Sequence, residues 1–157
     1  MYGILCTLSP KRLTQLAEDP EVLEDVLDAR EDEEIPGLLD VGKVWDALDL
    51  ILSDRGKDAV LGDVVLARTG KKLYVESSFE NARVLAPDRV AEVAKKLGAL
   101  PPTVVKDRYP QLAGKNVHGR YGKDPEEVPG LEIILARVVQ LYLAAADQKH
   151  SMLCVVI

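Results

Sequence analysis

Short apolar runs at the two ends of the chain flank a middle part in which apolar residues recur at helical spacing. Residues 2–8 (YGILCTL) and 150–157 (HSMLCVVI) are apolar runs of strand length. Runs of this length next to helix or turn signals are typical of buried strands. We therefore predict one strand at each end of the chain, and pairing between the two strands remains open.

Two helix-start signals follow the first strand. Ser9 precedes Pro10, and Asp19 precedes Pro20. Each pair sets a capping side chain before a proline at the first helical position, so a helix is predicted after each. The second of these helices has an apolar stripe, which consists of Val22, Leu23, Val26 and Leu27.

A third helix is predicted within residues 38–54, LLDVGKVWDALDLILSD, with Asp40 as its N-cap. At 100° per residue one arc of this helix is apolar. Trp45, the only tryptophan, falls at the edge of that arc, with Asp49 beside it and Asp46 further round. A half-buried indole N–H needs a polar partner, and Asp49 is the nearest candidate.

The following segments predict a hairpin and further helices. Residues 64–77 alternate in polarity about Thr69 and Gly70, which predicts a hairpin with its turn at these two residues. A helix is predicted from Pro87 to Gly98, and short helical pieces broken by Pro110 follow.

The last predicted helix, residues 130–148, is apolar over nearly half of its circumference, as expected of the central helix of a core. Ile133 and Leu143 lie outside that arc. They would be covered either by the acidic N-terminal helices or by a second subunit, so both a monomer and a homodimer remain open.

These elements predict an α+β fold in a single domain over residues 1–157. The expected architecture is a small mixed sheet that includes both terminal strands, packed against several helices, with the long C-terminal helix in the core. A length of 157 residues, 47% of them apolar and 29% charged, fits one globular domain. Cys6 and Cys154 lie in the two terminal runs, and we expect inert core thiols, although paired terminal strands leave a disulfide possible.

Composition also bears on location and partners. The first residues, MYGILCTLSP, lack the basic leader of a signal peptide, and Glu132, Arg137 and Gln140 interrupt the longest apolar segment. We therefore expect a cytoplasmic protein outside the membrane. Residues 18–34 hold ten acids against one base, whereas residues 68–123 hold twelve bases against five acids. The bases are spread over several predicted elements, so we expect no nucleic-acid partner, whereas the acidic block suits a basic one.

Candidate chemistry is sparse. His118, Arg120 and Tyr121 share a loop, and with Trp45 and Asp49 they could converge on a small anionic substrate, provided that the loop lies within about 10 Å of Trp45. The sequence has no nucleophile elbow, Walker loop or dinucleotide-binding glycine pattern. Two isolated histidines without neighbouring ligands predict no metal site, and we expect no cofactor.

Several segments resemble the YfbM-like family of bacterial proteins, a domain of unknown function. They are MYGILCTLSP, LDVGKVWDALDLILSD, AVLGD, ARVLAPDRVAEVAKKLGAL and the closing strand after a long helix. The resemblance covers most of the chain and implies a compact α+β domain, but no activity. Gly42 stands where the family pattern has aspartate, Asp49 where it has histidine, and the loop around Val117 and His118 lacks the usual tyrosine–proline pair.

The leading hypothesis is a non-enzymatic interaction module that binds a protein partner, immunity-like or regulatory. Its candidate binding residues are Trp45, Asp46, Asp49, His118, Arg120 and Tyr121. Opposite charge on two parts of the chain favours this interpretation, because electrostatic complementarity gives specificity and fast association. Replacing Glu31, Asp32, Glu33 and Glu34 by lysine should then weaken binding. The alternative is a small hydrolase or transferase that acts on an anionic substrate.

Overall fold

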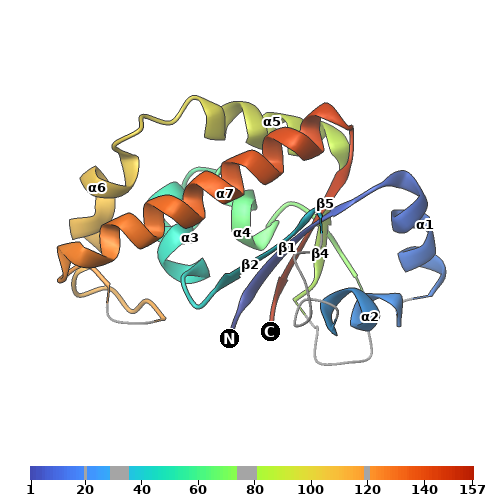
Figure 1. The fold of residues 1–157 in the computed structure, drawn as a ribbon, viewed down its shortest axis with the longest axis horizontal. Helices are drawn as coiled ribbons and strands as arrows, with labels where there is room; N and C mark the ends of the chain where they lie inside the picture. The colour runs from blue at the N-terminus through green and yellow to red at the C-terminus, as the bar shows by residue number, and fades with distance from the viewer. Residues whose placement is uncertain (20, 29–35, 74–80, 119–120) are drawn as a thin grey trace.

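A computed structural model describes residues 1–19, 21–28, 36–73, 81–118 and 121–157. Its centre is a five-stranded sheet in the order β2-β1-β5-β4-β3 (Figure 1). The strands are β1 (Gly3–Leu8), β2 (Leu38–Gly42), β3 (Lys71–Lys72), β4 (Arg83–Leu85) and β5 (Ser151–Val156). The predicted terminal strands thus form and pair as the central strands of the sheet. All four pairings are antiparallel, so the sheet is not mixed as the sequence analysis expected.

Helices cover both faces of the sheet. The helices are α1 (Pro10–Glu18), α2 (Val22–Asp28), α3 (Trp45–Ser53), α4 (Asp63–Leu66), α5 (Pro87–Gly98), α6 (Val104–Arg108) and α7 (Val128–Asp147). Figure 1 shows α1 and α2 on one side of the strands and α3 to α7 on the other. The α+β class is therefore confirmed, with the long C-terminal helix supplying Leu131, Leu135, Val138, Tyr142 and Ala145 to the core.

The two central strands, β1 and β5, alternate their apolar side chains between two cores. Leu5 of β1 and Cys154 of β5 face the core on the α3–α7 side, whereas Cys6 and Leu153 face the core beneath α1 and α2. A sheet buried on both faces needs continuous apolar strands, which is the pattern of the two terminal runs. The same alternation answers the cysteine question: Cys6 and Cys154 lie on opposite faces, and both are free thiols.

The helix-start signals of α1 and α2 are confirmed where the structure describes them. The Ser9 hydroxyl accepts a hydrogen bond from the Arg12 amide, and the Asp19 carboxylate accepts one from the Glu21 amide. Pro20 itself and the acidic residues 31–34 lie outside the described residues.

Two predictions about the middle of the chain were wrong. Asp40 does not cap a helix, because it lies in β2 and accepts a hydrogen bond from the Gly42 amide, and α3 begins only at Trp45. The hairpin about Thr69 is also absent. Residues 63–66 form α4, and β3 pairs instead with β4, further along the chain.

The outer face of α7 is exposed, which contradicts the proposal that the N-terminal helices cover it. Ile133 is 59% exposed and Leu143 is 42% exposed. The N-terminal helices pack on the other face of the sheet, so they do not cover these side chains. By length and composition alone, residues 125–147 are apolar enough to cross a membrane, a property shared with core helices of soluble proteins. Here the buried stripe of this helix packs on α5 and the sheet core, as in a small soluble domain.

Candidate functional site

The centre of the predicted site is α3, which is buried on almost every side. Asp46 is 7% exposed and Asp49 is 2% exposed, although the sequence analysis placed both on the polar side of the helix. Three of their neighbours, Leu48, Ile51 and Leu52, are buried in the larger core. A carboxylate in such surroundings needs charged or hydrogen-bonding partners, because an unpaired buried charge is strongly unfavourable.

Arg68 binds the buried carboxylate of Asp49. The two guanidinium nitrogens of Arg68 donate to the two carboxylate oxygens of Asp49 at 2.6 and 2.8 Å. Ser53 donates a further hydrogen bond to Asp49 at 3.0 Å. The bond with Asp49 raises the pKa of Arg68. Planar, bidentate pairs of this kind combine energy with fixed geometry, so this carboxylate holds the segment after α4 against α3.

Asp63, at the start of α4, makes a second buried pair that the sequence analysis did not identify. It is fully buried and accepts from Arg89 Nε at 2.6 Å, and from the amide and hydroxyl of Thr69 at 2.8 and 2.6 Å. Hydrogen bonds with Asp63 and Glu92 raise the pKa of Arg89. The signal was available in the sequence, because an aspartate within VLGDVVL predicts a buried carboxylate that must have a partner.

Asp46 joins α3 to the predicted loop. One oxygen accepts from Arg55 Nη1 at 3.1 Å, and the other accepts from the His118 backbone amide at 2.8 Å. The second guanidinium nitrogen of Arg55 donates to the Asn116 carbonyl at 2.6 Å. The loop therefore contacts α3 at Asp46, the residue after Trp45.

The described residues of this loop contact α3 through the backbone rather than through an acid–base side chain. His118 contacts α3 through its backbone amide, and the residue as a whole is exposed. Arg120 lies outside the described residues. Tyr121 is half-buried against the larger core, and burial, followed by the charge of Glu127, raises its pKa.

Trp45 is a packing residue at the start of α3. A Cβ atom added at Gly3 would lie 2.6 Å from the Trp45 Cβ, so β1 and this tryptophan approach as closely as glycine allows. Asp49, the predicted partner of the indole N–H, is bound to Arg68 instead. Among the described residues, Trp45 Nε1 has no hydrogen-bond partner although it is buried.

Asp58 forms a further ion pair on the surface between the end of α3 and α5. Its carboxylate accepts from Lys96 Nζ at 2.5 Å and from the amides of Val60 and Leu61, and these bonds lower its pKa, with the Lys96 bond first. Within the described residues, no group of three or more histidine, cysteine or carboxylate side chains could hold a metal ion. The charged residues around α3 thus form ion pairs, and these pairs hold the segments 54–70 and 116–118 in place.

Comparison with known proteins supports the fold but adds no chemistry. A family model described as a domain of unknown function, DUF1877, matches residues 1–155. The crystal structure of YfbM from Escherichia coli, a protein of unknown function, is similar over 100% of both chains, with a TM-score of 0.71 and 17% sequence identity. No curated protein matches. The chain belongs to the DUF1877 family, in agreement with its resemblance to YfbM-like proteins.

Proposed function

We propose that this chain is a cytoplasmic, non-enzymatic interaction module that binds an apolar helical segment with basic flanks, supplied by an immunity-like or regulatory protein partner. The observation that carries the proposal is the outer face of α7, where Ile133 and Leu143 are 59% and 42% exposed. The two side chains lie about 15 Å apart along the helix. Large apolar side chains that stay exposed beside an apolar groove favour an interaction surface.

A groove runs beside this face. It has a volume of about 440 Å³ and lies between α7 and the segment that joins α5 to α6. Leu100, Pro101, Pro102, Val104 and Val139 contribute its apolar walls. An amphipathic helix that places its apolar side chains in such a groove is a recurring mode of peptide recognition.

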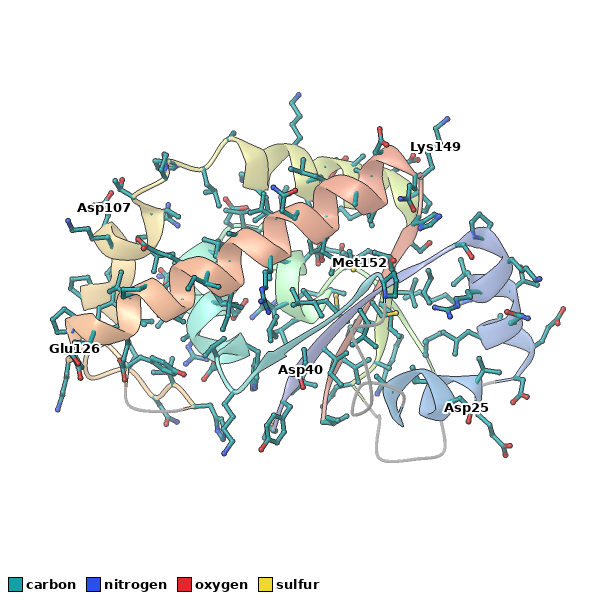
Figure 2. The ribbon with its side chains drawn as sticks, viewed as in Figure 1. Asp25, Asp40, Asp107, Glu126, Lys149 and Met152 are labelled. Carbon is teal, nitrogen blue, oxygen red and sulfur yellow. The ribbon has the colours of Figure 1, made fainter. Side chains whose placement is uncertain are left out.

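Three acidic side chains near the groove favour basic flanks on that helix. Glu132 lines the groove, and Figure 2 shows Asp107 and Glu126 at the same end of the molecule, where α7 begins. All three residues are exposed, and the chain as a whole has a net charge of −6. Lysine or arginine beside the apolar anchors of the partner would therefore speed association and fix its orientation.

Two designed helical peptides test this proposal. They share the same apolar residues, but one has lysine and arginine flanks and the other has glutamate flanks. In fluorescence anisotropy the basic peptide should bind the parent protein at least tenfold more tightly than the acidic one, and added salt should reduce the difference. Leu143→Glu and Ile133→Glu should each weaken binding of the basic peptide at least tenfold.

Tyr2→Glu is the matched control, because Tyr2 is also 42% exposed but lies at the N-terminus. It should leave peptide binding unchanged. Equal binding of the two peptides would refute the charge argument. A parent protein that sediments as a dimer, and becomes monomeric on Leu143→Glu, would show that a second copy covers this face instead.

A further inference from the structure

A second hollow lies on the opposite side of α7 from the groove, where the end of this helix meets β1 and the start of α1. Its volume is about 500 Å³, within the ~300–1,000 Å³ range of small-molecule pockets. Leu141, Ala144 and Ala145 form an apolar wall, and Thr7, Arg12 and His150 are among its polar lining residues. A mixed lining of this kind fits a ligand that has one polar end and an apolar body.

The polar end of the pocket is cationic. Arg12 is an exposed residue that lines the hollow. Burial raises the pKa of the neighbouring Cys6 thiol, and the charge of Arg12 offsets part of that rise. The carbonyls of Ala144, Ala145 and Ala146 at the end of α7 accept hydrogen bonds from the amides of residues 148–150. These carbonyls are therefore satisfied by the chain itself and are not free to bind the Arg12 guanidinium.

The second polar group of the pocket is the imidazole of His150, a hydrogen-bond donor. Its Nδ1 atom is closed off from solvent and has no hydrogen-bond partner within the described part of the chain. Of the two neutral tautomers, the one with hydrogen on Nε2 avoids burying an unsatisfied N–H group at Nδ1. With its hydrogen on Nε2, the imidazole of this lining residue has one N–H group with which it could donate to an anion.

The wall opposite α7 has no room for a side chain at Gly37. A Cβ atom there would lie 2.2 Å from the Thr7 hydroxyl, and the φ angle of +85° also favours glycine. The Gly37 carbonyl accepts from the Thr7 amide at 2.7 Å, which holds the two backbones together. The Thr7 hydroxyl is thus kept beside the pocket as a second neutral hydrogen-bonding group.

We propose that this pocket binds a small aliphatic carboxylate. Arg12 and His150 bind the carboxylate group, and the apolar body lies against Leu141 and Ala144. Neither the fold comparison nor the interaction surface on the outer face of α7 requires this site, so the two proposals stand or fall separately.

Octanoate, octanol and inorganic phosphate are the probes. Octanoate should shift the amide resonances of Thr7, Gly37 and Gln148 in a saturable way, whereas octanol and phosphate should bind at least tenfold more weakly. Arg12→Gln should weaken octanoate binding at least tenfold because it removes the cation. Ala144→Trp, at an exposed helix position, should do the same by filling the pocket.

Arg137→Gln is the control, since Arg137 is exposed on α7 but does not line the pocket. It should bind octanoate as the parent does. Each variant is checked for a parent-like amide spectrum, which separates lost binding from lost folding. The proposal is overturned if octanoate leaves the three amides unchanged, if octanol binds equally well, if phosphate binds equally well, or if Arg12→Gln and Ala144→Trp bind like the parent.

Discussion

At the scale of single residues, the buried aspartates decide how the α3 region is held. Asp49 and Asp63 are almost inaccessible, yet each has an arginine whose side chain remains about one-quarter to one-third exposed. Most of the desolvation cost therefore falls on the carboxylate of each pair. The attraction of the partly exposed arginine offsets that cost. Removing the arginine or the carboxylate has unequal consequences, because only the carboxylate is wholly within the core.

Asp63→Ala should lower the free energy of unfolding by about 3 kcal/mol, near the lower end of the range for a broken buried ion pair. The Arg89 side chain is 24% exposed and can regain water, whereas the two hydrogen bonds from Thr69 are lost outright. Urea unfolding followed by circular dichroism measures the change. Asp147→Ala, at an exposed position in the last turn of α7, should change stability by less than about 0.5 kcal/mol. Similar losses in the two variants would contradict the structural role given to Asp63.

The two cysteines should behave as protonated core groups. Burial raises the pKa of Cys6 to about 11 and that of Cys154 to about 12, from an ordinary value of 9.0. Between pH 9 and 12 the unfolded chain loses these protons before the folded chain does, so stability falls as pH rises through that window. Cys6→Ala, Cys154→Ala should make unfolding less dependent on pH there. At pH 8 neither native thiol should react with a thiol reagent within minutes, whereas both should react in denaturant.

At the scale of elements, local signals predicted the parts of the fold whose stability is local. Proline at the first helical position marked α1 and α5, and helical spacing marked α7, which begins two residues before its predicted start. β2 was missed because it lies at the edge of the sheet and only Val41 of its five residues is buried, so LLDVG has no strand pattern of its own. α4 was missed because long-range bonds from Asp63 to Thr69 and Arg89 stabilise a single turn that has no amphipathic period.

The candidate site, too, could be predicted from the sequence only in part. The aspartates of α3 were found because they are neighbours in sequence, but their arginine partners are 9 and 19 residues away along irregular segments. No periodicity links such positions, and only the tertiary fold brings them together. The departure at Gly42 has a local explanation, since its φ angle of +58° suits glycine, and aspartate is among the residues that tolerate this region.

Asp46→Asn should loosen the segment 116–118 without unfolding the protein. The amide substitution weakens the charge-assisted bonds from Arg55 and from the His118 backbone, whereas the packing of Val117 in the larger core is retained. Hydrogen exchange of the His118 amide should then become at least tenfold faster, with little change in β1 and β5. Asp40→Asn alters a carboxylate that, within the described residues, is bonded locally to the Gly42 amide, so it should leave His118 exchange as in the parent. Unchanged protection of His118 in Asp46→Asn would show that other contacts hold the loop.

At the scale of the whole molecule, the two ends of the chain form its centre. β1 and β5 pair along their full length and occupy the middle of the sheet, and the Tyr2 and Ile157 backbones exchange hydrogen bonds of 2.6 and 3.0 Å (Figure 1). A permuted chain that joins residue 157 to residue 1 by a short Gly/Ser linker, and opens at the exposed Gly114, should therefore fold to a parent-like amide spectrum. The linker preserves the β1–β5 pair, and the new ends fall outside both cores.

Deleting residues 151–157 should instead abolish cooperative unfolding, because Leu153 and Val155 leave one core while Met152 and Cys154 leave the other. A truncated chain that still unfolds cooperatively would show that either core can form without the strand between them.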